Sequence, residues 1–551
     1  MGLGYSGTRR TVYLAGIIVL GLLLYFVQIP FPWTPESPSN KEESWIPSTT
    51  TSTDNHLRAD VSKQRAIVAA FQHAWSAYER DAMGYDEYHS IRKKGSNFSK
   101  DGGVGYTIID AIDTMSLMGL KGEYSRARHW VKTKLSFDRS GNFNTFETTI
   151  RVLGGLLSAY YLTSDKLYLD RAIDLADRML PAFDTPSGLP LPSVNLSASA
   201  GIPDQWTPDR ISTAEASTLQ LEFRYLAQLT KNDKYWYKAE KVMSIIYNAR
   251  LSHNLVPIFM SAENGGFTSS EIRLGSRGDS YYEYLLKQYL QTNYTEPIYH
   301  KMYDDAMEGI HNKLVHKTPR HHLTYIAELI PQGNSGDLEK MNWSLQHKQD
   351  HLVCFLAGSL MLGAAASEGQ NLSEPAQPKL FKPRAKRDWK LGVELLESCM
   401  RTHETETGLS PEIAMFRDKI DETAERDWYI KNWRKGGGAT TYDARYMLRP
   451  ETVESLFLAW RLTGDMRYRN YAWGIFTSIE KHCRLPGGGY ATVLDVDTVP
   501  AKWDDKQETF FLSETLKYLY LTFSDSSVLP LQDVAHPLPV FAPAFVPAFS
   551  I

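Results

Sequence analysis

An acidic residue, an apolar helix and a short Thr-containing turn recur in that order along this 551-residue chain. The clear copies open at Glu147, Glu215 and Glu451, and their turns read TSD at 163–165, TKND at 230–233 and TGD at 463–465. Weaker copies open at Asp113, Asp279, Asp350 and Glu508, and the acids at 147, 215, 279 and 350 lie 64 to 71 residues apart. A helical pair that cannot bury its own apolar face must stack on its neighbours. The repeat therefore predicts one large helical domain instead of several average ones.

Two kinds of predicted helix alternate within the repeat. Residues 107–120 are apolar nearly all round, which is typical of a buried inner helix, whereas 168–180 and 234–247 are amphipathic. An inner ring of helices wrapped by an outer ring requires this alternation. Residues 490–494 follow a glycine-rich turn and predict a strand of a small hairpin. If the stack closes, the opening acids converge at one end of an all-α toroid with short β-hairpin excursions.

The N-terminal region predicts a membrane anchor. Residues 12–30 are almost unbroken apolar sequence, preceded by Arg9 and Arg10. That length spans a slightly thin bilayer as a helix, and the arginines keep the N-terminus cytosolic. A cleaved signal peptide is the alternative, but the stretch runs into Pro30 instead of a small-residue cleavage site. We therefore predict a cytosolic tail over 1–11, a transmembrane signal anchor over 12–30 and a flexible luminal stem over 31–60.

Composition adds limits on function. A net charge of −4 gives no indication of a nucleic-acid partner, and no pattern of Cys and His suggests zinc. The three cysteines allow one disulfide in an oxidising compartment and leave one thiol free. Five glycosylation sequons give weak further support for a luminal location, and they begin at Asn97, Asn195, Asn293, Asn342 and Asn371.

Charged neighbours distinguish several of the opening acids from ordinary helix starts. An acid in the first turn of a helix often only complements the helix dipole. Glu147, however, precedes Arg151 by one turn inside an apolar run. Arg449 and Arg277 stand two residues before Glu451 and Asp279, respectively. Charges at the first turns of buried helices need a solvated pocket or mutual pairing. Several of them together indicate a pocket lined with carboxylates, and paired carboxylates are the groups that catalyse glycoside hydrolysis.

Seven ordered motifs carry a specific resemblance. They are IDAIDT at 109–114, FETTIRVLGGLLS at 146–158, RGDSYYEY at 277–284, DHLVC at 350–354, GLSPE at 408–412, LRPETVES at 448–455 and ETFFLSETLKY at 508–518. Over roughly residues 62–540 the chain resembles the class I α-1,2-mannosidases of glycoside hydrolase family 47. The resemblance implies an (α/α)7 barrel, here over 61–540 with a C-terminal tail at 541–551. It also implies an inverting, calcium-dependent hydrolase that removes terminal α-1,2-linked mannose from N-glycans.

The resemblance implies roles for individual residues as well. Glu147 and Asp279 match the two candidates for the general acid, and either could protonate the leaving oxygen directly or through water. Glu451 matches the general base and Glu412 a further active-site carboxylate, and inversion requires about 6.5–9.5 Å between acid and base. Further matches line the family's sugar site: Arg151, Glu215, Asp350, His351, Arg449, Glu454, Phe510 and Glu514. Arg277 resembles the endoplasmic reticulum enzyme type, which trims chiefly one mannose from the nine-mannose glycan, because a guanidinium can hydrogen-bond several hydroxyls at once.

Two more implications concern a disulfide and a metal. Cys354 and Cys399 occupy the positions of the family's single disulfide, which leaves Cys483 as a buried thiol. The family's calcium binds a Thr in a Thr-Glu-Ala-His-Pro stretch near the C-terminus, where this chain has Asp533 and Val534 in place of the Thr and the Glu. A carboxylate is a good calcium ligand, whereas loss of the Glu removes an outer-shell partner.

Three hypotheses of function remain open at this point. The leading one is a type II membrane enzyme of the endoplasmic reticulum, with the Golgi as the alternative compartment, that trims high-mannose N-glycans in glycoprotein processing and quality control. The second is a mannosidase-like lectin that binds these glycans for degradation of misfolded glycoproteins. The altered calcium stretch favours the lectin, and the intact trio Glu147, Asp279 and Glu451 disfavours it. The third is a helical scaffold whose acids merely cap helices, and it leaves the inward arginines unexplained.

Overall fold

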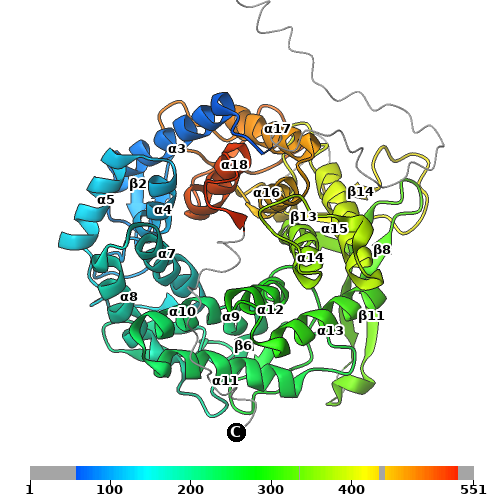
Figure 1. The fold of residues 1–551 in the computed structure, drawn as a ribbon, viewed down its shortest axis with the longest axis horizontal. Coiled ribbons are helices and arrows are strands. Elements are labelled where there is room, and N and C mark those ends of the chain that lie inside the picture. Colours follow the sequence, from blue (N-terminus) through cyan, green and yellow to red (C-terminus); the bar gives the residue numbers. More distant parts are fainter. Residues whose placement is uncertain (1–56, 334–335, 434–440, 532–551) are drawn as a thin grey trace, which may run out of the picture. The chain divides into compact units, whose positions relative to one another are not determined.

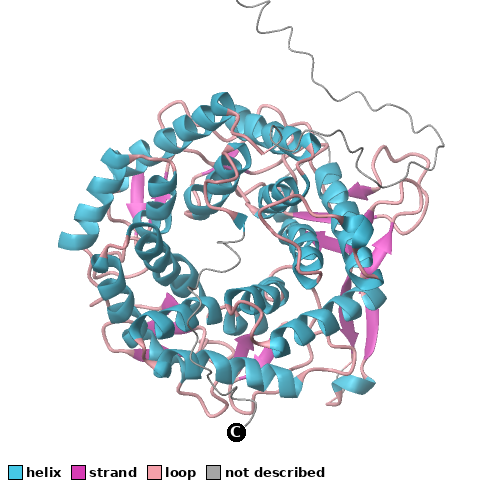
Figure 2. Cartoon of the chain, in the orientation of Figure 1, coloured by secondary structure: helices cyan, strands magenta, loops and turns pink. Residues whose placement is uncertain are grey.

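Helices alternate along the sequence between an inner and an outer layer of a ring (Figures 1 and 2). The computed structural model describes residues 57–333, 336–433 and 441–531. The outer helices are α3 (Val61–Ala82), α5 (Lys121–Thr133), α8 (Lys166–Met179), α11 (Asp233–Ala249), α13 (Pro297–Lys313), α15 (Pro383–Thr402) and α17 (Met466–His482).

The inner layer contains seven segments in the described ranges, several of them built from two or three helical pieces. They are α4 (Tyr106–Leu117); α6 (Thr145–Glu147) with the π-helical turn η1 (Thr148–Leu153) and α7 (Gly154–Thr163); α9 (Thr213–Ser217) with α10 (Gln220–Thr230); α12 (Asp279–Gln291); the 3-10 turn η4 (His351–Cys354) with α14 (Phe355–Ser367); α16 (Glu451–Thr463); and the π-helical turn η7 (Phe511–Thr515) with α18 (Leu516–Phe523).

Contacts between neighbouring inner segments close the ring. They run from α4 through α7, α10, α12, α14 and α16 to α18, and η7 packs back against α4. Each inner segment also packs on one outer helix, in the pairs α4–α5, α7–α8, α10–α11, α12–α13, α14–α15, α16–α17 and α18–α3. The first outer helix therefore covers the last inner one. This arrangement is the (α/α)7 ring that the family resemblance implied.

Burial separates the two layers as the sequence pattern predicted. The inner helix α14 is apolar nearly all round, and twelve of its thirteen residues are buried. It fits between α15 and α16 because glycines allow close approach: a Cβ on Gly392 would lie 2.7 Å from the Ala357 carbonyl, and one on Gly358 would lie 2.9 Å from the Ser455 Cα. Outer helices such as α8 bury one face only.

Short antiparallel strands occupy the connections, as predicted. The small sheets are β1 (Glu87–His89) with β2 (Lys94–Ser96); β3 (Phe143–Asn144) with β4 (Ser193–Asn195) and β5 (Ala200–Ile202); β6 (Arg210–Ser212) with β7 (Phe259–Ser261); β8 (Val315–Lys317) with β9 (Thr324–Ile326); β10 (Glu328–Gln332) with β11 (Asn342–Gln346); β12 (Lys348–Asp350) with β13 (Ile413–Phe416) and β14 (Trp428–Tyr429); and β15 (Thr492–Val493) with β16 (Trp503–Asp504). Strands β3, β6 and β12 lead directly into inner segments, so they fix where those segments begin.

Helix caps explain the recurrent Thr-x-Asp turns. Ser164 and Gly464 end α7 and α16 with left-handed φ values of 56° and 68°. Asp165 and Asp465 follow immediately and cap α8 and α17, because each side chain accepts a backbone N–H of the next turn. One short motif therefore both ends an inner helix and starts an outer one.

The prediction that Asp113 opens an inner helix is wrong. Helix α4 begins at Tyr106, so Asp113 lies in its second half. The carboxylate that serves the start of α4 belongs to Asp86, which accepts the N–H groups of Val104 at 2.8 Å and Gly105 at 2.9 Å. The repeat pattern missed this start because the carboxylate comes from a loop about 20 residues earlier in the chain.

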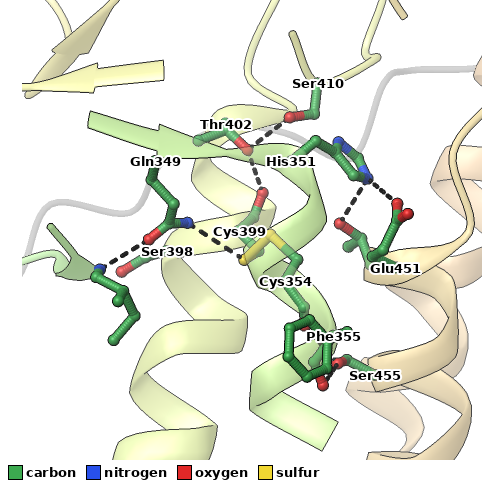
Figure 3. Close-up of a disulfide and its surroundings, with 12 residues drawn as sticks. Gln349, His351, Cys354, Phe355, Ser398, Cys399, Thr402, Ser410, Glu451 and Ser455 are labelled. Atoms are coloured by element: carbon green, nitrogen blue, oxygen red, sulfur yellow. Dashed lines mark hydrogen bonds and ion pairs between the residues drawn. A yellow bond between two sulfur atoms is a disulfide. The ribbon is translucent and has the colours of Figure 1, made fainter. Parts of the chain in front are cut away.

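A disulfide joins Cys354 of η4 to Cys399 of α15, with the two Cα atoms 6.0 Å apart (Figure 3). This confirms the pairing that the family resemblance implied, and Cys483 is buried and free as expected. Because Cys354 lies three residues after His351, the bridge ties this part of the inner layer to an outer helix. Figure 3 shows His351 pointing from that segment toward Glu451.

Several predictions on chain organisation lie beyond the described ranges. None of the helices in residues 57–333, 336–433 and 441–531 is long and apolar enough to cross a membrane. The predicted anchor at 12–30 and the predicted C-terminal tail at 541–551 fall outside those ranges. The domain limits of 61 and 540 stay a prediction.

Replacing both bridged cysteines, Cys354→Ser together with Cys399→Ser, should lower the free energy of unfolding by about 4 kcal/mol. The reason is that the unfolded chain is no longer constrained across the 45-residue separation. Thermal melting followed by circular dichroism without reductant measures the effect, and reduced wild type should melt like the double variant. Equal melting temperatures for the oxidised wild type and the variant would contradict this account.

Candidate active site

The inner segments surround one cavity of about 590 Å³, and every one of them contributes residues to its wall. Ten of the residues predicted from the sequence line it: Glu147, Arg151, Glu215, Arg277, Asp279, Arg449, Glu451, Glu454, Phe510 and Glu514. Three others, Asp350, His351 and Glu412, are buried outside the lining. Asp533 lies outside the described residues. The trio Glu147, Asp279 and Glu451 therefore faces a single shared space.

Glu147 and Arg151 form one wall. Asn144 caps this segment by accepting the Glu147 N–H at 2.7 Å, and the chain then enters the π-helical turn η1. Arg151 Nε donates to Glu147 Oε2 at 2.5 Å, and its Nη1 lies 3.6 Å from Asp110 and 3.5 Å from Glu514. Burial disfavours the charge of Arg151, but these three carboxylates outweigh burial and raise its pKa. The guanidinium therefore stays charged and holds acids from three inner segments.

Asp279 is the first residue of α12, at the end of a rigid turn. Its N–H donates to the Gly275 carbonyl at 3.0 Å, and a Cβ on Gly275 would lie 2.1 Å from Asp350 Oδ2. That same Asp350 oxygen accepts the Ser276 N–H at 3.2 Å. Asp350 thus braces the turn from behind. Burial raises the pKa of Asp279 to about 7, and the nearby acids Glu283 and Asp350 add to the rise.

Glu451 is the first residue of α16 and lines the same cavity. Burial raises its pKa to about 8, and the charge of Arg449 partly offsets that rise. Arg449 donates to both oxygens of Glu412, at 3.1 and 2.5 Å, and its Nη1 lies 3.9 Å from Glu451 Oε1. Glu412 thus anchors the arginine from outside the cavity lining.

His351 approaches the same carboxylate from behind. Its Nε2 lies 3.8 Å from Glu451 Oε2 and 3.2 Å from Thr452 Oγ1 (Figure 3). Burial lowers the pKa of His351 well below its usual value, and His403 and Arg449 add to this effect. A neutral ring next to the carboxylate does not offset the negative charge of Glu451.

Phe510 provides an apolar surface among these charges. Its ring lies 5.2 Å from the Arg151 guanidinium carbon and 5.6 Å from that of Arg449. Only 8% of the residue is exposed, and it lines the cavity. Such a ring suits the apolar face of a pyranose, while the two cations beside it can bind hydroxyl groups.

Arg277 and Glu215 lie on a third side of the wall. Arg277 Nη1 is 3.2 Å from Glu215 Oε1, and 45% of the arginine side chain is exposed. Arg277 has a φ of 73°, a left-handed conformation that is strained for a residue with a side chain. Burial raises the pKa of Glu215, and Arg277 offsets part of the rise. This pair can present hydrogen-bond donors to a ligand entering the cavity.

Sequence reasoning singled out Asp113 as an opening acid, but it missed the polar residues that contact it and the charged pair Glu283 and Lys287, all of which line the cavity. Lys517 Nζ lies 2.7 Å from Asp113 Oδ2, and the Ser158 hydroxyl donates to the same oxygen at 2.6 Å. Lys287 pairs with Glu283 and lies 3.5 Å from Glu454. The sequence spacing could have identified Glu283 and Lys287, because Asp279, Glu283 and Lys287 are each four residues apart and therefore share one face of α12.

Negative groups dominate the cavity wall. Ten carboxylates line it, against five cations. The acids are Asp110, Asp113, Glu147, Glu215, Glu222, Asp279, Glu283, Glu451, Glu454 and Glu514, and the cations are Arg151, Arg277, Lys287, Arg449 and Lys517. Burial raises the pKa of Glu222 and of Glu514 to about 7 and also raises that of Glu454. Paired carboxylates in a water-accessible pit, some of which keep a proton near neutral pH, can perform acid–base hydrolysis.

Comparisons with known proteins agree with this chemistry. The model of glycosyl hydrolase family 47 matches residues 70–540. The endoplasmic reticulum mannosyl-oligosaccharide 1,2-alpha-mannosidase of Schizosaccharomyces pombe is 43% identical over 495 residues, which cover 88% of this chain and 90% of that protein. The mannosyl-oligosaccharide 1,2-alpha-mannosidase of Candida albicans is 41% identical over 493 residues, covering 87% and 83%. A solved structure of an alpha-1,2-mannosidase from Trichoderma reesei matches with a TM-score of 0.73 at 27% identity, covering 85% of this chain and 94% of that one.

Fold and site together define a glycoside hydrolase built on a ring of paired helices. The chain belongs to glycosyl hydrolase family 47.

Replacing Asp279 by Asn should stabilise the fold at pH 7. Burial raises the folded-state pKa of this carboxyl to about 7, whereas the unfolded value is about 3.9. The folded state therefore binds the proton more tightly, so ionisation costs stability as the pH rises from about 4 to 7. We expect Asp279→Asn to add about 1–2 kcal/mol at pH 7 and almost nothing at pH 4. Chemical denaturation at both pH values measures this, and a variant less stable than wild type at pH 7 would contradict it.

Proposed function

We propose that this chain hydrolyses terminal α-1,2-linked mannose in high-mannose N-glycans with inversion, trimming the nine-mannose glycan to eight. The observation that carries the proposal is the single cavity shared by Glu147, Asp279 and Glu451. Relatives named for the same linkage, at 41% and 43% identity, support the substrate class. A structure of an alpha-1,2-mannosidase with a TM-score of 0.73 supports it further.

Glu147 and Asp279 form the acid side of the proposed mechanism. Asp279 retains its proton near neutral pH because burial raises its pKa to about 7. Glu147 is the more accessible member, with 40% of its side chain exposed, and Arg151 fixes its position. One of the two protonates the oxygen of the leaving sugar, either directly or through a bound water.

Glu451 is the proposed general base. It removes a proton from the attacking water, which approaches the anomeric carbon from the face opposite the leaving group. Burial raises the pKa of Glu451 to about 8, so this carboxyl must first lose its proton to act as a base; the charge of Arg449, which Glu412 anchors, favours that ionised form. We expect the carboxyl groups of acid and base to be about 6.5–9.5 Å apart, which leaves room for that water.

Binding of the cleaved sugar is assigned to the residues beside the trio. The Phe510 ring supports the apolar face of the pyranose, and Arg151, Arg449 and Glu514 bind hydroxyls around it. Arg277, half-exposed next to Glu215, contacts a neighbouring branch and restricts cleavage to chiefly one mannose. Asp350 and His351 act from behind the wall by bracing the Asp279 turn and the Glu451 carboxylate.

We also propose that the enzyme needs a calcium ion. The cavity fits a hard cation by charge and donor type, because ten carboxylates line it against five cations. No group of three or more His, Cys, Asp or Glu within residues 57–333, 336–433 and 441–531 is placed to ligate a metal directly. Asp533, which lies outside the described residues, would hold the ion through its carboxylate. When bound, the ion adds positive charge that favours ionised carboxylates nearby.

The proposed location is the endoplasmic reticulum membrane, with residues 12–30 as a type II anchor and the ring in the lumen. The relative from Schizosaccharomyces pombe is named for the same organelle. The Cys354–Cys399 disulfide is consistent with an oxidising compartment. The partners are then glycoproteins that carry high-mannose N-glycans.

Replacing Glu451 by Gln should lower kcat by about 100- to 10,000-fold, because the attacking water loses its base. Mass spectrometry of nine-mannose glycan incubated with each protein measures the release of mannose. Glu79→Gln, on the outer helix α3, is the matched control and should behave like wild type. Binding of the glycan by wild type without release would favour a lectin instead, and neither binding nor release would favour a scaffold.

Removing the metal should destabilise the protein as well as inactivate it. A ligand that binds only the folded state adds RT ln(1 + [L]/Kd) to stability, so calcium at about 100 times its Kd raises the unfolding free energy by about 2.7 kcal/mol. Differential scanning fluorimetry in chelator and in about 1 mM calcium compares the metal-free and the calcium-bound protein. Asp533→Ala should need more calcium to regain the same melting temperature. An unchanged melting temperature in chelator and calcium would contradict the assignment.

A further inference from the structure

Two arginines share one aromatic ring beside the cavity, and cleavage chemistry does not use this arrangement. The guanidinium carbon of Arg210 lies 4.5 Å from the centre of the Phe259 ring, and that of Arg277 lies 5.4 Å from it. We call Arg210, Phe259 and Arg277 the Phe259 stack. Arg277 lines the cavity, whereas Arg210 is an exposed residue of β6. The stack therefore extends from the cavity wall to the surface.

Strand register produces the stack. Strands β6 and β7 are antiparallel, with Ser212 opposite Phe259 and Arg210 opposite Ser261. Arg210 is thus the diagonal neighbour of Phe259 on the same face, a separation that long side chains can bridge. The Phe259 backbone is fixed on both sides, since its N–H donates to Ser270 Oγ at 3.2 Å and its carbonyl accepts the Thr268 N–H at 2.9 Å. The strand backbone that carries the ring is therefore held in place.

The two guanidinium groups differ in what else they contact. Arg277 is paired with Glu215 at 3.2 Å. In the described part of the chain, Arg210 forms no ion pair, and its charge contributes only slightly to the lowered pKa of the fully exposed Asp204 on the preceding loop. Because Arg210 is exposed and has no acid partner in the described part of the chain, its donors face solvent and are available to a ligand. A stacked guanidinium keeps its donors free in its own plane, and vicinal sugar hydroxyls match that fork.

We infer that Phe259 and Arg210 form an outer subsite that binds a neutral mannose of a branch not being cleaved, and that Phe259 also orients Arg277 toward the cavity. The inference deepens the proposed function and rests on it for the substrate class. Phe259 is a positioning residue in this account, and Arg210 is a specificity-determining one. Neither touches the scissile bond.

The test compares a large and a small substrate. Arg210→Leu should lower kcat/KM for the nine-mannose glycan about tenfold, the effect of losing one or two hydrogen bonds. It should leave kcat/KM for the α-1,2-linked mannose disaccharide within about twofold, because the disaccharide does not reach β6. Phe259→Leu should show the same split and should also yield a mixture of eight-mannose isomers, because Arg277 loses its support. Arg65→Leu, an exposed arginine of the outer helix α3, is the control for removing one surface charge.

Each outcome decides between the subsite and a purely structural role. A proportional fall for both substrates, or unchanged kinetics for both with normal melting temperatures, would overturn the inference. If wild type cleaves neither substrate, the proposed hydrolase function is contradicted, but the inferred subsite is not yet tested. Calorimetric binding in a Glu451→Gln background still tests the subsite in that case: weaker binding of the nine-mannose glycan but not of the disaccharide by Arg210→Leu supports it, and equal effects on both refute it.

Discussion

Arg151 and Arg449, both close to the Phe510 ring, hold the acids of this site together. Arg151 contacts carboxylates from α4, α6 and η7, and Arg449 contacts Glu412 and Glu451. Without these cations, the first turns of neighbouring inner segments would place like charges side by side in a buried space, at a cost of several kcal/mol. With them, the ring can bury acids from chain positions hundreds of residues apart. Ring closure, cavity and chemistry all depend on this balance of charge.

Incomplete neutralisation is what makes the site reactive. Cations are half as numerous as carboxylates on the cavity wall. Burial then raises the pKa of Asp279 to about 7 and that of Glu451 to about 8, so both titrate near neutral pH. Each raised pKa is also a stability cost at neutral pH. Tight packing of helices such as α14 offsets that cost elsewhere in the ring.

Much of the architecture could be predicted from the sequence because the repeat is a physical unit. Left-handed caps at Ser164 and Gly464, followed by capping aspartates, appear directly as Thr-x-Asp motifs. The repeat itself pointed to Glu147, Glu215, Asp279 and Glu451, whereas family motifs added Phe510, Glu514 and the Cys354–Cys399 pair, which periodicity alone did not identify. Asp113 was misassigned because a distant carboxylate, that of Asp86, serves the start of α4. The stack on Phe259 could not be foreseen because it depends on the register of two three-residue strands far apart in the chain.

The stereochemistry of the released sugar tests the account most directly. A site with an acid and a base on opposite faces of the sugar, separated by a water molecule, must invert the anomeric carbon. Proton NMR recorded during the first minutes of hydrolysis, before mutarotation equilibrates the sugar, should therefore show β-mannose appearing first from the α-linked substrate. Initial appearance of α-mannose would mean a covalent intermediate and closely spaced carboxylates, and it would contradict the roles assigned to Glu147, Asp279 and Glu451.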